Sequence, residues 1–296
     1  GVVSSMKAAD LFLPITIHLW FLYYLLLYCV GAFLLLRVGR LCLPRGVRSI
    51  PTRILGSLTM IPGGTLLLCL PLILFLKNTA GLLATGVTFI PEPNSFFAYG
   101  FIYLCGWSFW SQRTHLDRLK SWPKSIGSIL LTLILYLYWL EFFLQWIGLP
   151  AGDLTRSTCA TLGVEIPDGE TSMWIGASLS ALMIWNGIWG FLGLCLLITN
   201  REIPRIRYIV DGSYWVYIIH LPFTVLIPGL LVHQSLGAFP KFFITLVLTT
   251  LIGYLSYDWF VRSGVIGQLL NGRRWPRALG RALRNRDLVE PEEQSI

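Results

Sequence analysis

Apolar residues form long uninterrupted runs along the chain, separated by short stretches that carry most of the charges. A helix needs about 20 mainly apolar residues to cross a bilayer, and seven runs are near that length. The pattern therefore predicts an all-α fold, a polytopic transmembrane helical bundle in which residues 1–296 form a single domain. The spans are expected at residues 12–36, 54–76, 95–111, 127–149, 172–199, 213–233 and 241–261.

The composition supports a membrane protein. The chain is 55% hydrophobic and 13% charged, and its mean hydropathy is +0.66, whereas soluble domains carry roughly a quarter charged residues. The six cysteines are scattered singly, which predicts neither a disulfide framework nor a bound metal. Phosphate-cradling glycine loops, dinucleotide-binding fingerprints, GxSxG and HExxH are absent from the sequence, so the corresponding soluble enzyme classes are excluded.

The basic residues lie in alternate loops, and the formal net charge is +8. Loops rich in Lys and Arg stay on the cytoplasmic side of a membrane. Positive-inside topology explains this charge better than nucleic-acid binding does. Residues 1–11 are expected to face outward, and the arginine-rich segments are expected in the cytoplasm: 37–53, 112–124, 201–208 and the basic tail 263–296.

Three ionisable side chains lie within the predicted spans at bilayer depth: His18, Glu141 and His220. Such groups cost about 2.5 to 3.5 kcal/mol on insertion scales, which makes each a candidate for a functional site. Counting residues places His18 and Glu141 in the outer half of the bilayer and His220 in the inner half. We take these three as the candidate catalytic residues.

Each candidate also has a structural interpretation. A lone histidine in a helix bundle often bridges two helices by a hydrogen bond. Glu141 and Gln145, with two tryptophans close by, are typical either of an interfacial belt or of a surface that faces carbohydrate. Asn186 is expected to bridge helices, and Asp258 is expected to pair with Arg262 near the membrane surface.

The sixth predicted span begins with DGSYWVYIIHLPF, residues 211–223. Asp211 or Ser213 is expected to cap the free N–H groups of this helix. With Arg201, Arg205 and Arg207 just before it, the helix start is either an anion site for a phosphate-bearing substrate or ordinary positive-inside charge. Pro222 removes a backbone donor one turn beyond Ile218. That pattern predicts a helix lining an internal cavity.

Four blocks resemble the acyltransferase family 3 membrane proteins, and they occur in that family's order: HLWFLYYLLLYCVGAFLLL (18–36), YGFIYLCGWSFWSQRTHLDRLK (99–120), PRIRYIVDGSYWVYIIHLPF (204–223) and YDWFVRSGVIGQLLNGRR (257–274). The resemblance is strongest to the branch that succinylates periplasmic glucans. It implies a bacterial inner-membrane O-acyltransferase that moves an acetyl or succinyl group from a cytoplasmic acyl-CoA-type donor to a hydroxyl of an extracytoplasmic glycan. No permanently bound cofactor is implied.

The family usually has about ten spans with both termini inside the cell. Seven spans with an outward start therefore predict three further spans upstream, among them the helix with the family's arginine–histidine signature, which residues 1–17 do not contain. The family blocks imply His18 and His220 as catalytic candidates, with Glu141 added from its depth. The expected substrate-binding residues are Trp20, Asp211, Ser213, Tyr214, Tyr217, Arg205 and Arg207.

Two other classes of protein stay open. One is a transporter or flippase of glycans, for which the breaks MIPGGT and VLIPGLL are typical. The other is an inactive truncated remnant of the enzyme. The expected partners are the lipid bilayer, the acyl donor and the glycan acceptor. The identity of the acyl group and the oligomeric state are not predicted.

Overall fold

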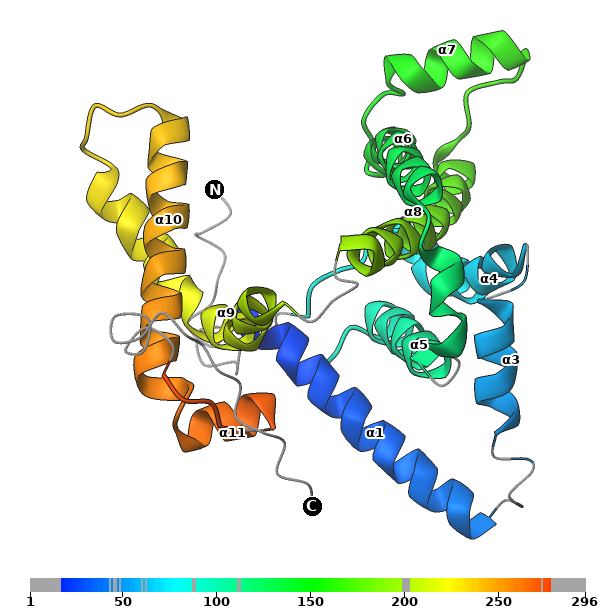
Figure 1. The fold of residues 1–296 in the computed structure, drawn as a ribbon. Helices are drawn as coiled ribbons and strands as arrows, with labels where there is room; N and C mark the ends of the chain where they lie inside the picture. The colour runs from blue at the N-terminus through cyan, green and yellow to red at the C-terminus, as the bar shows by residue number, and fades with distance from the viewer. Residues whose placement is uncertain are drawn as a thin grey trace. The chain divides into compact units, whose positions relative to one another are not determined.

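The computed structural model describes residues 17–42, 44, 47, 49–59, 61, 63–86, 89–110, 113–198, 203–272 and 274–277. Every regular element in these ranges is a helix (Figure 1). A bilayer offers no water to backbone N–H and C=O groups, so helices that bond their own backbone are the favoured structure. The predicted all-α class is confirmed. The predictions for residues 1–11 and for most of the basic tail lie outside the described residues.

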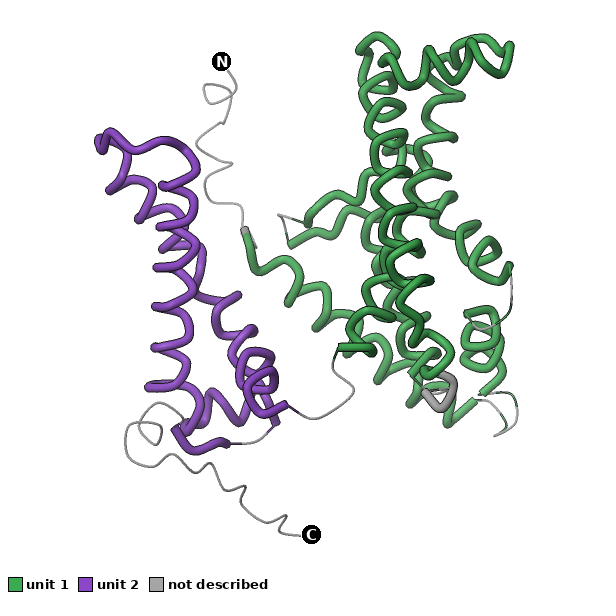
Figure 2. Tube along the Cα trace, turned by 45° about the horizontal axis from the view of Figure 1, so that its top comes forward, with its two compact units in different colours: residues 1–200 green, residues 201–296 purple. Residues whose placement is uncertain are grey.

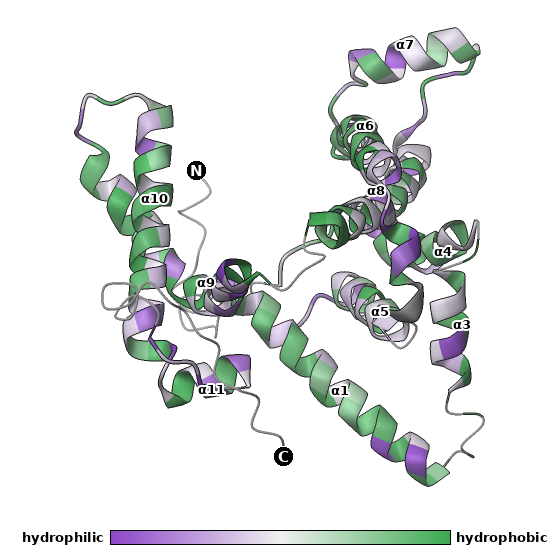
Figure 3. Cartoon of the chain, in the orientation of Figure 1, coloured by the Kyte–Doolittle hydropathy of each residue, from purple (hydrophilic) through white to green (hydrophobic). Residues whose placement is uncertain are grey.

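Five helices of the described chain are long and apolar enough to cross a membrane, and they match the first, fourth, fifth, sixth and seventh predicted spans. Their residues are largely hydrophobic (Figure 3), and large apolar side chains such as Leu35 and Leu41 are exposed. That exposure is expected where the solvent is lipid. The five segments are Trp20–Cys42, Trp122–Trp146, Gly169–Ile198, Pro204–Leu231 and Ala238–Val261.

The prediction that residues 54–76 form one continuous helix was wrong. It is divided into α3 (Ile50–Leu58) and α4 (Gly64–Leu76), and α4 continues as the short 3₁₀ helix η4 (Lys77–Thr79). The chain turns at Gly63, which has a φ of 77°, a conformation open to glycine at little cost. The turn also brings Gly64 so close to Leu58 that a Cβ would lie 2.0 Å from the Leu58 carbonyl oxygen.

The third predicted span, 95–111, corresponds to α5 (Pro93–Trp110). A helix was correctly predicted there, but α5 is not among the five segments apolar enough to qualify as a span.

The chain divides into two compact units, residues 1–200 and 201–296 (Figure 2). The described elements of unit 1 are the helices already named together with η3 (Ile17–Leu19), α1 (Trp20–Cys42), η5 (Arg113–Leu119), α6 (Trp122–Trp146), α7 (Asp153–Leu162) and α8 (Gly169–Ile198).

The core of unit 1 lies where α4 and α5 pack against α8. Its buried side chains are Leu68, Cys69, Leu72, Leu76, Ala98, Cys105, Ala177, Ala181 and Trp185. Small residues on α8 let its neighbours approach closely, as is usual between membrane helices. On the face toward α6, a Cβ at Gly190 would lie 2.9 Å from the side chain of Ile129, and a Cβ at Gly193 would lie 2.4 Å from Ser125 Oγ.

The turn that follows η4 packs directly on α8. Ala80 and Gly81 have positive φ angles of 48° and 85°, and both carbonyl oxygens accept side-chain hydrogen bonds. Trp139 Nε1 of α6 donates to Ala80 O at 3.0 Å, and Ser180 Oγ of α8 donates to Gly81 O at 2.7 Å. One turn of backbone therefore joins α4, α6 and α8.

Unit 2 contains α9 (Pro204–Leu231), α10 (Ala238–Ser256), the π-helical turn η6 (Tyr257–Val261) and α11 (Val265–Asn271). α9 packs against α10, and glycines again mark the closest approach. A Cβ at Gly212 would lie 2.6 Å from the Tyr254 ring, and one at Gly253 would lie 2.9 Å from Val216. Asn271 Nδ2 joins α11 to α9 by a hydrogen bond of 3.1 Å to Asp211 O.

Replacing Gly176 with alanine should destabilise unit 1, because the new Cβ would lie 2.8 Å from the carbonyl oxygen of Ala80. Overpacking of this kind costs about 1–3 kcal/mol. The measurement is the free energy of unfolding in mixed micelles, followed by tryptophan fluorescence. Gly106→Ala in α5 is the matched control, since nothing lies within 4 Å of a Cβ there. Equal stabilities of the two variants would contradict the close packing of the turn on α8.

Candidate functional site

The candidate His18 lies in η3, directly before α1, and it is half-buried. Trp20, Tyr24 and Tyr28 lie one turn apart on one face of α1, and α5 presents aromatic rings to that face. The ring centroids of Trp20 and Tyr99 are 5.5 Å apart, and those of Tyr28 and Tyr103 are 5.6 Å apart. Trp20, an expected substrate-binding residue, therefore belongs to the aromatic packing between α1 and α5.

Tyr24 is the centre of this aromatic cluster and is 2% exposed. Its ring contacts five others, those of Trp20, Tyr23, Tyr28, Phe96 and Tyr99. Its hydroxyl is buried. It lies beneath Gly86, where a Cβ would be 2.4 Å away. Sequence reasoning missed this residue because a tyrosine at helical spacing does not differ from ordinary core packing.

Glu92 holds the start of α5. Its two carboxylate oxygens accept hydrogen bonds from the backbone N–H groups of Asn94, at 3.0 Å, and Ser95, at 2.6 Å. Burial would raise the pKa of this carboxyl group, but the hydrogen bonds from Ser95 and Asn94 outweigh burial and hold the pKa below its usual value. The sequence analysis did not select Glu92, although an acidic residue just before a helix is a known cap signal.

The carboxylate of Glu141 accepts hydrogen bonds from the first turn of α7. One oxygen accepts a hydrogen bond from Leu154 N at 3.1 Å, and the other accepts two from Thr155, from N and from Oγ1, both at 2.6 Å. Gly152 lets the carboxylate approach, since a Cβ there would lie 2.4 Å from the Glu141 carboxyl carbon. The side chain thus caps the N-terminus of a neighbouring helix, a role that the sequence did not indicate.

Gln145, one turn beyond Glu141, donates a hydrogen bond to the carbonyl oxygen of Pro167. Glu141 and Gln145 therefore both form hydrogen bonds with the segment that connects α6 to α8. The third polar candidate, Asn186, donates to Leu182 O of its own helix at 2.9 Å, whereas the sequence analysis expected it to bridge two helices.

In unit 2 the expected cap of the sixth span was wrong. α9 begins at Pro204, and its N-cap is Ile203, so Asp211 and Ser213 lie two turns inside the helix. Ser213 Oγ donates to Val210 O at 2.7 Å rather than to a free N–H group. The physical reason is Pro204, which suits the first helical position because its missing N–H would have no partner there.

Arg205 and Arg207 lie in the first turn of α9, and Arg201 lies outside the described residues. Arg205 is exposed, and the guanidinium group of Arg207 lies 5.2 Å from the centroid of the Trp275 ring. Ile203 contributes no side-chain hydrogen bond to the helix start. The N–H groups of this turn and the arginine side chains thus occupy one end of α9, the arrangement that attracts anions.

Tyr214, Tyr217 and His220 lie further along α9. Tyr214 is 41% exposed. Tyr217 and His220 are half-buried and neighbours, with ring centroids 5.8 Å apart. His220 Nδ1 lies 2.7 Å from the carbonyl oxygen of Tyr217. The helix continues through Pro222 and Pro228 without interruption.

Asp258 pairs with Arg262, as the sequence predicted. The Arg262 Nε–Asp258 Oδ1 distance is 3.9 Å, and the aspartate side chain is fully buried. The guanidinium group also lies 4.8 Å from the centroid of the Tyr208 ring. The pair lies on the π-helical turn η6 and its next residue. π-turns often occur at functional sites, but this one also orders the end of α10.

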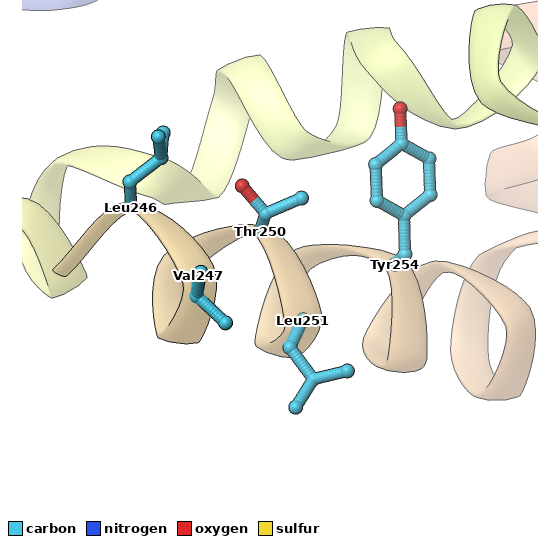
Figure 4. A pocket seen from close by; sticks show the side chains of 5 residues that line it. All are labelled: Leu246, Val247, Thr250, Leu251 and Tyr254. Carbon is cyan, nitrogen blue, oxygen red and sulfur yellow. The ribbon is translucent and has the colours of Figure 1, made fainter. Parts of the chain in front are cut away.

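Unit 2 has an apolar hollow of about 350 Å³ on α10 (Figure 4). Its lining residues are Leu246, Val247, Thr250, Leu251 and Tyr254. The expected site residues are distributed over both units. His18, Trp20 and Glu141 belong to unit 1, and Arg205, Arg207, Asp211, Ser213, Tyr214, Tyr217 and His220 belong to unit 2.

A family model described as an acyltransferase domain matches residues 2–258, most of the chain. The chain belongs to acyltransferase family 3. Together with the five long apolar helices, membership identifies a multi-pass membrane protein with an acyltransferase domain. Comparisons with curated proteins and with solved structures found no significant match, so nothing in them supports the glucan-succinylating branch.

Replacing Glu141 with glutamine should loosen α7, because an amide keeps one acceptor oxygen where the carboxylate has two. Loss of a helix cap costs about 1 kcal/mol, so backbone hydrogens of residues 153–162 should exchange roughly five times faster. Hydrogen exchange read by mass spectrometry measures this. Glu165→Gln, an exposed change in the same loop, should leave the exchange of α7 unchanged. Unaltered protection in the Glu141 variant would contradict the capping role.

Proposed function

We propose that this acyltransferase takes an acyl group, acetyl or succinyl, from a cytoplasmic acyl-CoA-type donor and passes it to a hydroxyl of an extracytoplasmic glycan such as a periplasmic glucan. Family membership supports the reaction type. The observation that carries the proposal further is His220, an ionisable group inside the long apolar helix α9, in direct contact with Tyr217. An ionisable side chain at bilayer depth is costly, which makes His220 a candidate for a functional site.

The start of α9 supports a donor that carries phosphates. Arg205 and Arg207 provide positive charge there, and the first turn of the helix has backbone N–H groups without helical partners. Phosphate binds readily to this combination. On this proposal the arginine-rich loops and the C-terminus lie on the cytoplasmic side of a bacterial inner membrane, the side on which an acyl-CoA is available.

The proposed reaction is acyl transfer from a thioester to an alcohol. A histidine takes the proton of the glycan hydroxyl while the hydroxyl oxygen forms a bond to the thioester carbonyl carbon. The C–S bond then breaks, and the proton passes from the histidine to the departing sulfur, which leaves as a thiol. A histidine suits both transfers because its ordinary pKa is close to neutral. The products are an ester on the glycan and free coenzyme A.

A glycan transporter is the second candidate function. The two predicted helix breaks are the observations that bear on it. The expected break at MIPGGT is present, since the chain turns at Gly63 between α3 and α4. The expected break at VLIPGLL is absent, since α9 is continuous through Pro228. Broken helices in corresponding positions are the mark of a transporter site, and only one of the two positions is broken here.

Mass spectrometry of periplasmic glycans from cells with and without the intact gene tests the proposal. Acyl-substituted glycans should appear only when the gene is present. Glycans that are moved across the membrane without any covalent change would favour the transporter instead. An absence of both effects would leave the inactive remnant as the better description.

His220→Ala should lower glycan acylation by about 100-fold or more, the range that one general base contributes, at an unchanged protein level. His233→Ala is the matched control, because His233 lies in the exposed turn after α9. That variant should keep wild-type acylation. Wild-type substitution in the His220 variant would remove this residue from the proposed mechanism.

A further inference from the structure

Residues 274–277, which follow α11, are bound to the end of a membrane span. Trp275 N donates a hydrogen bond to Arg262 O at 3.0 Å, and Arg262 Nε donates one to Pro276 O at 2.8 Å. Arg262 immediately follows the span Ala238–Val261. The segment is neither helix nor strand, yet two hydrogen bonds hold its backbone, so its position at this end of unit 2 is fixed.

Two arginines of this segment lie against the end of the span and against α11. Arg277 Nη2 donates a hydrogen bond to Trp259 O at 3.1 Å, and Arg274 Nε donates one to Gln268 Oε1 at 3.0 Å. Both arginines are exposed. Among the residues that the structure describes, neither forms an ion pair with a carboxylate. Their positive charges are therefore available to an anion from outside the chain.

Large apolar side chains are exposed beside the same two arginines. Trp259, whose carbonyl oxygen binds Arg277, is 63% exposed, and Leu269, the chain neighbour of Gln268, is 83% exposed. Phe260, which follows Trp259 on the π-helical turn η6, is exposed as well. Arginines next to exposed aromatic and aliphatic groups at the end of a span are typical of the level where lipid headgroups meet acyl chains.

We propose that this surface binds an anionic phospholipid. The two guanidinium groups hold the phosphate, and the acyl chains cover the apolar side chains. Arginine suits this ligand because its planar fork donates paired hydrogen bonds to phosphate oxygens. The residues of this lipid site are Arg274, Arg277, Trp259, Phe260 and Leu269. Lipid binding here is independent of the acyl transfer proposed above.

The apolar part of the lipid site favours a phospholipid over a soluble phosphate. Coenzyme A or inorganic phosphate could occupy the arginines, but neither has a long hydrocarbon chain to cover Trp259, Phe260 and Leu269. A phospholipid satisfies both halves of the surface at once. On the proposed topology this end of unit 2 faces the cytoplasm, and the cytoplasmic leaflet carries anionic lipid that attracts arginines close to the membrane.

Native mass spectrometry of the full chain tests the lipid site. The chain is titrated in detergent micelles with phosphatidylglycerol or with phosphatidylcholine, and the affinity of each bound lipid is measured. An arginine near a membrane surface strengthens the binding of anionic lipid by about fivefold. With two arginines in the site, the wild-type chain should bind phosphatidylglycerol about tenfold more tightly or better. Equal affinities for the two lipids would overturn the proposal without any variant.

Arg274→Gln and Arg277→Gln should each weaken the binding of phosphatidylglycerol about fivefold and leave that of phosphatidylcholine unchanged. Arg277→Lys keeps the charge and should keep most of the affinity, whereas a merely structural role of Arg277 would be lost in both variants. Arg156→Gln is the matched control, because it removes an exposed arginine from α7 in unit 1. An equal loss in that control would show an effect of net charge and overturn the site.

Competition distinguishes the lipid from a soluble phosphate. Neither coenzyme A nor glycerol phosphate, added at the concentration of the lipid, should displace bound phosphatidylglycerol. Displacement by either one would overturn the lipid as the occupant and assign the arginines to a soluble ligand. Since lipid affinity is measured without any acyl transfer, a chain that binds the lipid but transfers no acyl group contradicts only the proposed function.

Discussion

The packing of unit 1 depends on one turn of backbone pressed against a helix of small residues. Ala80 and Gly81 direct their carbonyl oxygens into an apolar bundle, where an unbonded carbonyl would cost several kcal/mol. Trp139 and Ser180 satisfy them, and Gly176 leaves room for the turn. Because the two donors lie on α6 and α8, these hydrogen bonds also fix how the long helical pair lies against α4.

The same principle appears where polar side chains in the helices bind backbone groups. Glu141 binds two N–H groups of α7, Asn271 binds a carbonyl of α9, and His220 binds a carbonyl in its own helix. In a bilayer such partners are scarce, so a polar side chain that finds one is strongly oriented.

The length and hydrophobicity of the apolar runs were enough to predict the helical class and five spans. A helix that crosses a bilayer must be both long enough and apolar enough. Local geometry was harder to predict. The break at Gly63 depends on the approach of Gly64 to Leu58, which a run of apolar letters does not reveal. The true start of α9 had a signal in Pro204, but the acidic residue at 211 was given more weight. The partners of Glu141 lie in the first turn of α7, and no sequence pattern indicates that this helix returns to the end of α6.

Because Glu141 caps α7, any segment that replaces the one between α6 and α8 must meet a structural requirement. A replacement segment of any length must bring two unbonded N–H groups and a hydroxyl to the same carboxylate, as Leu154 and Thr155 do. A segment that lacks them would leave a negative charge without partners at the end of a membrane helix. The length of a replacement segment therefore matters less than the geometry of its first helical turn.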